Sequence, residues 1–164
     1  MIFVTVGHQM PFDRLLRVVD QWAALHPDQA VRGQTGESAY APEHMNCQRM
    51  LSRDEYADCL DRCDAVVAHA GTGTIIDCLL QNKPLLVLPR LSELGETRND
   101  HQIGTARHFA EQGQILAAYS EDELLQKLDE LKQFRPARDI GTSASPELLA
   151  RLQEFLSAAD AGSG

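Results

Sequence analysis

A glycine-rich turn between two apolar segments is the part of this chain best suited to chemistry. Residues 69–74 read HAGTGT, follow the apolar run 65–68 and precede Ile75 and Ile76. This order predicts a buried strand, a tight turn and then a helix. The first amides of a helix have no partner within it, and the helix dipole favours an anion there. Because two glycines leave space for close approach, the turn predicts a phosphate site.

Side chains around the turn offer contacts to a sugar as well as to a phosphate. Asp77 lies one helical turn after Gly73, where its carboxylate reaches toward a sugar hydroxyl, and Thr72 and Thr74 add hydroxyl donors. His69 ends the strand and faces the expected crevice. The simplest ligand with this chemistry is a nucleotide or a nucleotide-sugar. Structural roles stay open as alternatives: threonine as a helix cap, Asp77 as a partner of the helix dipole, and His69 as a hydrogen-bonded core imidazole.

The turn matches neither of two common phosphate-binding motifs. Gly71 and Gly73 fit the first two glycines of a dinucleotide fingerprint, but Ile76 occupies the position of the third. No Gly-Lys-Ser/Thr follows, so the turn is not a P-loop either.

Two other loops carry polar groups. Gly7 follows the first apolar run and is either a plain tight turn or a point of close approach to a ligand, and His8 beside it is a phosphate donor, a proton shuttle or a solvated residue. The segment 98–102 (Arg-Asn-Asp-His-Gln) is rich in donors and acceptors at the start of a predicted helix. Two such loops beside one glycine turn favour a crevice for a polar ligand.

Strands and helices must alternate to bring these loops together. The expected strands are 2–6, 29–34, 47–51, 65–69, 85–88 and 114–118; the expected helices are 12–25, 52–63, 73–81 and 100–112, one that opens at Ser120 and one that opens at Ser145-Pro146. Ser52 with Glu55, and Ser120 with Glu123, have the spacing of capping boxes. Fully apolar strands between helices predict an α/β fold: a Rossmann-like parallel sheet with helices on both faces, whose ligands lie beyond the carboxyl ends of the strands.

Composition limits the classes of partner. The chain has 164 residues, of which 43% are hydrophobic and 24% charged, which suits one globular domain. Its net charge of −9 argues against a nucleic-acid partner and against adsorption to an acidic membrane by charge alone. No apolar run approaches the roughly 20 residues of a membrane span, and the N-terminus lacks a basic leader, so we expect a cytoplasmic protein. The four cysteines are expected to be reduced thiols, and Cys59 with Cys63 has no second pair that would complete a zinc site.

The motifs together resemble the C-terminal, donor-binding domain of family 28 glycosyltransferases, and most closely its short stand-alone members. The resemblance runs from Met1 to about Glu123 and rests on residues 5–7, the turn 69–74, Lys83-Pro84-Leu85 and the segment 99–102. The segments 11–16 and 95–102 favour the bacterial exopolysaccharide branch over the eukaryotic dolichol-pathway branch.

The resemblance implies one half of a GT-B enzyme that is inverting, independent of metal or cofactor, and uses a UDP-sugar. By matching position, Gly71, Thr72, Gly73 and Thr74 would hold the diphosphate, Asp77 the ribose, and Asn99, Asp100, His101 and Gln102 the donor sugar. Gly7 would let the first loop approach the diphosphate or the acceptor. This chain has His8 where the family has threonine, and Asp77 where the family often has glutamate. His69 completes the expected substrate-binding set.

Fixed N–H dipoles at 71–74 would stabilise the charge that grows on the leaving UDP. The base that deprotonates the acceptor is expected from a separate, membrane-associated subunit, with His8 as the one candidate in this chain. We therefore expect a UDP-sugar-binding domain at 1–157, a flexible tail at 158–164, recruitment to the inner face of the membrane through the partner, and little or no transfer by this chain alone. The acceptor is implied to be a lipid-linked saccharide; the donor sugar is open among N-acetylglucosamine, glucose, galactose and glucuronate.

Three rival interpretations stay open. The chain is a non-catalytic UDP-sugar-binding accessory module, an epimerase-like half on the same architecture, or a homo-oligomer in which a second copy covers the crevice. A transfer assay with and without the partner, incubation with UDP-GlcNAc alone, and light scattering distinguish them.

Overall fold

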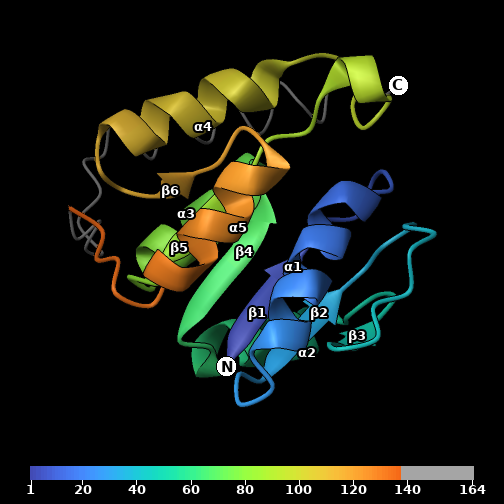
Figure 1. The fold of residues 1–164 in the computed structure, drawn as a ribbon. Coiled ribbons are helices and arrows are strands. Elements are labelled where there is room, and N and C mark those ends of the chain that lie inside the picture. Colours follow the sequence, from blue (N-terminus) through green and yellow to red (C-terminus); the bar gives the residue numbers. More distant parts are fainter. Residues whose placement is uncertain (138–164) are drawn as a thin grey trace.

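Six parallel strands form a single sheet in the order β3-β2-β1-β4-β5-β6 in the computed structural model, which describes residues 1–137 (Figure 1). The strands are β1 Ile2–Thr5, β2 Val31–Gln34, β3 Asn46–Gln48, β4 Ala65–His69, β5 Leu85–Leu88 and β6 Leu116–Ala117. The helices are α1 Asp13–Leu25, α2 Arg53–Arg62, α3 Thr72–Leu80, α4 His101–Glu111 and α5 Glu121–Glu130, with a short 3-10 helix η1 at Ser92–Leu94. The predicted α/β class is therefore confirmed.

The predicted elements are present and differ mainly at the edges of the sheet. The strands expected at 65–69 and 85–88 have those bounds, whereas those expected at 47–51 and 114–118 shrink to Asn46–Gln48 and Leu116–Ala117. Each short strand pairs with one neighbour only, so fewer ladder hydrogen bonds define its length. The helix expected from Ser145, the end of the domain at 157 and the tail 158–164 lie outside the described residues.

Two serines start helices as their spacing predicts. The Ser52 hydroxyl accepts from the Glu55 N–H while the Glu55 carboxylate accepts from the Ser52 N–H, which completes a capping box. The Ser120 hydroxyl likewise accepts from the Glu123 N–H, but the Glu123 carboxylate accepts from the N–H of Tyr119 instead of Ser120. The second box is therefore incomplete, although it still satisfies two backbone donors.

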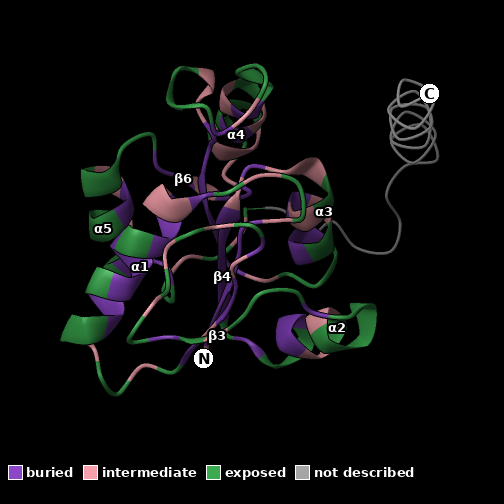
Figure 2. Ribbon diagram, turned by 90° about the vertical axis from the view of Figure 1, so that its right-hand side faces the viewer, coloured by how far each residue is buried: buried purple, intermediate pink, exposed green. Residues whose placement is uncertain are grey.

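Helices cover both faces of the sheet (Figure 2), and alternate residues of the central strands belong to two separate core clusters. Ile2, Val4, Val67, Leu86 and Leu88 pack with side chains of α1 and α5. The residues between them in the strands pack with α2, α3 and α4; they are Phe3, Val66, Ala68, Leu85 and Val87. Burial on both faces explains why these strands are apolar throughout. Among the described residues, no helix combines the length and apolar character that crossing a membrane requires.

The strand order places the predicted loops at one end of the sheet. β1 pairs with β2 on one side and with β4 on the other, so the direction of winding reverses between β1 and β4. In open parallel sheets, ligands bind at such a reversal, beyond the carboxyl ends of the strands. The loop after β1 and the glycine turn after β4 leave the sheet at this point.

Candidate functional site

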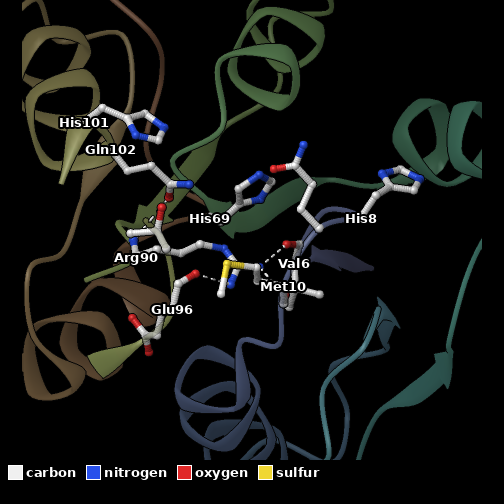
Figure 3. Close-up of a pocket in the computed structure, with 10 residues that line it drawn as sticks. Val6, His8, Met10, His69, Arg90, Glu96, His101 and Gln102 are labelled. Carbon is white, nitrogen blue, oxygen red and sulfur yellow. Dashed lines mark hydrogen bonds between the residues drawn. The ribbon is translucent and has the colours of Figure 1, made fainter. Parts of the chain in front are cut away.

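Two cavities open beyond the carboxyl ends of β1, β4 and β5. The His69 cavity has a volume of about 110 Å³, and its walls are Val6, His8, Gln9, Met10, His69, Arg90, Glu96, Thr97, His101 and Gln102 (Figure 3). The Tyr56 cavity has a volume of about 350 Å³, and its walls are Thr5, Gly7, His8, Leu51, Ser52, Arg53, Tyr56, Gly73, Thr74 and Asp77. His8 is exposed and lines both cavities. The three loops predicted to form a crevice therefore do so.

The amides that begin α3 are available to a ligand. The first bond of this helix to the turn joins the Ile75 N–H to the Gly71 carbonyl at 3.1 Å. In the part of the chain that the structure describes, the N–H groups of Thr72, Gly73 and Thr74 donate to no acceptor, and no side chain caps the helix. Three unpaired donors at the positive end of a helix dipole provide what an anion site requires, and binding of a phosphate there stays a prediction.

The imidazole of His69 lies between two glycines. A Cβ atom at Gly7 would lie 2.7 Å from the His69 Cε1, and one at Gly71 would lie 2.2 Å from its Nε2. Gly7 also has a φ of 77°, which favours glycine. Both glycines thus make room for the histidine ring, a structural role that the local sequence does not indicate. Gly73 differs, because nothing lies within 4 Å of a Cβ placed there.

His69 is neutral near pH 7. Burial, together with the positive charge of Arg90, lowers the pKa of its imidazole from 6.5 to about 4. Its Nδ1 is buried and has no hydrogen-bond partner among the described residues. Hydrogen bonding with the Thr5 backbone opposes the fall in this pKa, so the interpretation of His69 as a hydrogen-bonded core imidazole stays open beside a role in ligand binding.

Asp77 lines the Tyr56 cavity together with Gly73 and Thr74, as its spacing predicted. The Tyr56 hydroxyl donates to Asp77 Oδ2 at 3.5 Å. Partial desolvation raises the pKa of the Asp77 carboxyl, and the hydrogen bond from Tyr56 opposes that rise. A carboxylate in this position can accept hydrogen bonds from the hydroxyls of a ribose.

Of the sugar-binding residues predicted in the loop after β5 and the start of α4, two form hydrogen bonds within the protein and two line a cavity. The Asp100 carboxylate accepts from the N–H and the hydroxyl of Ser92, at 2.8 and 2.9 Å, and so holds η1. These bonds lower the pKa of Asp100. Asn99 binds the backbone and ring of His101 through its side-chain oxygen. His101 and Gln102 line the His69 cavity, whereas contacts of Asn99 and Asp100 with a sugar stay predictions.

Several residues of the site were missed at the level of sequence. Leu51, Arg53 and Tyr56 line the Tyr56 cavity because the loop after β3 and the start of α2 reach across to α3. Arg90 follows β5 directly and is buried, with 4% of its surface exposed. A charged residue immediately after an apolar strand was the available signal for Arg90. No such signal marked Tyr56, since its role depends on the order of the strands.

The described residues contain no cluster of three or more histidine, cysteine, aspartate or glutamate side chains that could hold a metal ion. Cys59, Cys63 and Cys78 are buried free thiols whose pKa values are raised by desolvation. The chemistry that these residues can supply is therefore hydrogen-bond donation from amides and imidazoles, one carboxylate beside the anion site, and an exposed histidine between the cavities.

Comparison with known families gives one match over most of the chain. The Glycosyltransferase family 28 C-terminal domain matches residues 1–155. Two curated proteins named "UDP-N-acetylglucosamine transferase subunit ALG13" are also similar. The one from Candida albicans is 40% identical over 50 residues, and the one from Homo sapiens is 25% identical over 124 residues. These matches cover 30% and 70% of this chain but span only 16% and 10% of the lengths of the two relatives.

Solved structures share the fold at low sequence identity. A solution structure of ALG13 superposes with a TM-score of 0.60 at 22% identity, covering 83% of this chain and 88% of that one. The crystal structure of the glycotransferase of kitacinnamycin gives a TM-score of 0.58 at 18% identity, covering 93% of this chain and 37% of that one. The second match places the present fold within part of a larger chain.

Proposed function

Because the chain belongs to the Glycosyltransferase family 28 C-terminal domain family, we propose that it is the donor-binding and catalytic subunit of a two-component, inverting UDP-sugar glycosyltransferase. Its fold is the Rossmann-like half of a GT-B glycosyltransferase. The observation that carries the proposal is the set of unpaired amides at Thr72, Gly73 and Thr74, located where the winding of the sheet reverses.

In this proposal the two cavities hold the two ends of one donor. The diphosphate lies at the N-terminus of α3, the ribose reaches Asp77 in the Tyr56 cavity, and the sugar enters the His69 cavity toward His101 and Gln102. Gln102 supports this orientation, because its side-chain oxygen accepts from the Arg90 N–H at 3.2 Å. Its amide NH₂ group is thereby the part left to donate to a sugar hydroxyl.

Catalysis then rests on charge stabilisation. As the bond between the anomeric carbon and the phosphate oxygen breaks, negative charge grows on UDP, and the oriented amides of α3 stabilise it without reorganising. The donors that would do this are neutral N–H groups, which is why we propose a reaction that needs no metal. The neutral His69 adds a hydrogen-bond donor at the same end of the sheet.

The acceptor side is proposed to come from a second subunit associated with the membrane, which would recruit this chain to the inner face and supply the base. The word "subunit" in the names of the relatives supports a partner. The same names favour UDP-N-acetylglucosamine as donor, and a lipid-linked saccharide is our proposed acceptor. His8 is the candidate base within this chain, because it is exposed where the two cavities meet.

The test is a calorimetric titration with UDP and with UDP-linked N-acetylglucosamine, glucose, galactose and glucuronate. We expect UDP to bind and one UDP-sugar to bind more tightly than the others. Absence of binding for UDP and for all four sugars at millimolar concentration would refute the proposal. Transfer to a lipid-linked acceptor, measured with and without the partner subunit, separates catalysis from an accessory binding role.

A further inference from the structure

The two terminal nitrogens of the Arg90 guanidinium each donate to two main-chain carbonyls. Its Nη2 donates to the carbonyls of Val6 and Met10, both at 2.7 Å, and its Nη1 donates to that of Glu96 at 3.1 Å (Figure 3). Its Nη1 also donates to the Pro11 carbonyl at 2.6 Å. The side chain also lies over the ring of Phe12, with Cζ 4.6 Å from the ring centroid. Both terminal nitrogens of this buried arginine are therefore engaged by the main chain of the protein.

Three of these four bonds join two loops of the crevice, since Arg90 itself lies in the loop that contains Glu96. Val6, Met10 and Pro11 belong to the loop between β1 and α1, which carries His8. Glu96 belongs to the loop between β5 and α4, which leads to His101 and Gln102. The two loops are therefore held as one body across the His69 cavity.

An ion pair between Arg14 and Glu96 reinforces the same junction. Arg14, on α1, donates to both carboxylate oxygens of Glu96 at 2.8 Å and to the Pro89 carbonyl at 3.0 Å. Both charged side chains are largely buried, with 13% and 10% of their surfaces exposed. The Glu96 carboxylate also accepts from the Leu91 N–H at 3.0 Å. Bidentate pairs of this kind fix geometry as well as charge.

The loop after β1 is held from the opposite side by Gln34. This side chain is fully buried; its Nε2 donates to the Gly7 carbonyl at 3.2 Å and its Oε1 accepts from the Leu51 N–H at 3.3 Å. Carbonyls on both sides of His8 are thus bound away from the crevice. Because a peptide N–H points opposite to the preceding carbonyl, the His8 N–H is turned away from Gln34.

We propose that Arg90 is a positioning residue for the donor sugar: its side chain sets the His8 loop against the Glu96 loop, and its main chain orients the amide of Gln102. This inference rests on the proposed function for the identity of the ligand. It assigns the diphosphate to the α3 amides, which Arg90 does not contact, and the sugar to the cavity that Arg90 shapes. Loss of its hydrogen bonds should therefore weaken sugar binding more than binding of the diphosphate.

The test compares UDP with UDP-N-acetylglucosamine, or with the preferred UDP-sugar, on Arg90→Lys. Lysine keeps the charge but cannot reproduce four fork-like hydrogen bonds. We expect the affinity for the UDP-sugar to fall about tenfold, which is roughly the effect of losing one hydrogen bond to the sugar. The affinity for UDP alone should change less than about threefold, as its diphosphate lies on the amides of α3.

Controls separate positioning from general damage. Arg17→Lys is the matched control, because Arg17 lies over the Tyr40 ring on the same helix as Arg14 and does not line either cavity. Hydrogen exchange should accelerate at residues 6–12 in Arg90→Lys and stay unchanged in Arg17→Lys. If Arg90→Lys does not fold, Glu96→Gln loosens the same junction through Arg14 and takes its place.

Equal losses for UDP and UDP-sugar, or an unchanged ratio with unchanged exchange, would overturn the positioning role. If the unmodified protein binds neither ligand, the proposed function fails first. The two failures are therefore distinguishable.

Discussion

The His69 ring determines what its neighbours can be. It occupies the space that side chains at Gly7 and Gly71 would need, and its Nδ1 is buried without a partner in the described part of the chain. A buried polar atom left unpaired costs free energy unless a ligand or water satisfies it. Burial and the charge of Arg90 also hold the ring in its neutral form.

His69 should make stability depend on pH. Its pKa is about 4 in the folded protein against 6.5 in the unfolded chain, so the unfolded chain binds more protons between these values. Stability is therefore lost as the pH falls below 6.5, by about 2 kcal/mol at pH 5. We expect His69→Gln to remove this part of the loss, measured by urea unfolding at pH 7 and pH 5. Equal losses in both proteins would contradict a neutral buried imidazole.

We expect the Asp77 carboxylate to lower the stability of the folded protein slightly and to raise its affinity for UDP. Desolvation raises the pKa of its carboxyl in the folded protein, so the ionised form is slightly unfavourable to folding at neutral pH. Asp77→Asn is expected to leave the melting temperature unchanged or slightly higher. The same change should weaken UDP binding about tenfold or more, because a charged hydrogen bond to the ribose contributes about 1.5–3 kcal/mol. Asp58→Asn, at a partly exposed position of α2 that lines neither cavity, is the control, and calorimetry gives the affinities.

The residue types around the glycine turn could be predicted from the sequence, but several of their partners could not. Gly71, Gly73 and Asp77 follow from local spacing within one strand and one helix. Arg90, Gln34 and Tyr56 act on residues 21 to 84 positions away in sequence, such as Gly7, Asp77 and Val6. Only the strand order brings these groups together, and no local pattern contains that order.

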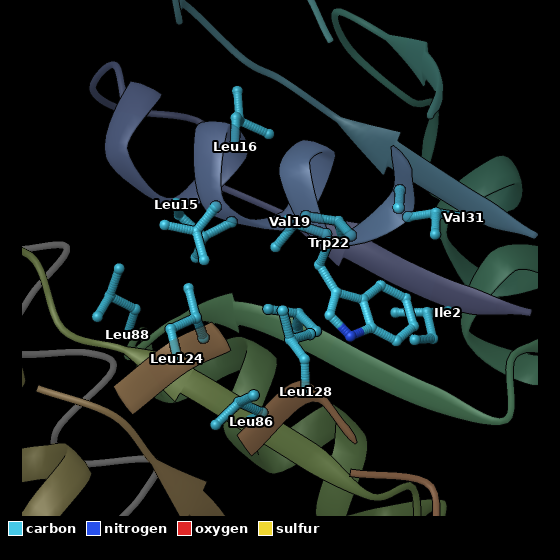
Figure 4. Close-up of a cluster of buried hydrophobic side chains, with 14 of the residues drawn as sticks. Ile2, Leu15, Leu16, Val19, Trp22, Val31, Leu86, Leu88, Leu124 and Leu128 are labelled. Carbon is cyan, nitrogen blue, oxygen red and sulfur yellow. The ribbon is translucent and has the colours of Figure 1, made fainter. Parts of the chain in front are cut away.

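Elements were predictable where a local signal fixed them. The apolar residues of α1 recur at helical spacing, and Leu15, Leu16, Val19 and Trp22 all enter the core against β-strands and α5 (Figure 4). The capping box at Ser52 likewise fixes the start of α2. The short edge strands β3 and β6 were misjudged, because pairing with a single neighbour and not local composition decides where they end.

The start of α3 offers a matched pair of substitutions. Gly73→Ala places a methyl group in open space within a helix and should stabilise the protein by up to about 1 kcal/mol. Gly71→Ala drives a methyl group into His69 and should destabilise it by about 1–3 kcal/mol. Urea unfolding measures both. Equal effects would show that the ring does not occupy the place described.

A larger side chain at Gly73 tests binding at the same element. Gly73→Leu should fold, since nothing lies within 4 Å of the new Cβ, but should fill the space beside the α3 amides. UDP at 100 times its Kd should raise the melting temperature of the unmodified protein by about 5–10 °C. We expect this rise to disappear in Gly73→Leu. A rise that persists in full would leave the glycine turn with a structural role only.

At the scale of the whole molecule, the order of the strands explains how a negatively charged protein could bind an anion. The chain carries a net charge of −9, yet the proposed ligand is itself an anion. Winding the sheet in opposite directions from β1 and β4 leaves a crevice where helix N-termini and loop amides gather. Local dipoles can then bind a diphosphate although the distant field of the protein repels it.

Salt dependence distinguishes this arrangement from a site built on cationic side chains. Hydrogen bonds from the Thr72, Gly73 and Thr74 amides act at contact distance, where salt screens little, whereas repulsion by the net negative charge acts over longer distances and is screened. We therefore expect the Kd for UDP to stay within about twofold, or to decrease, between 20 and 200 mM NaCl. Calorimetry in sodium chloride, with sodium acetate as a control for specific anion effects, measures it. A steep loss of affinity with salt would mean that lysine or arginine side chains hold the diphosphate, and the amides of α3 would no longer explain the binding.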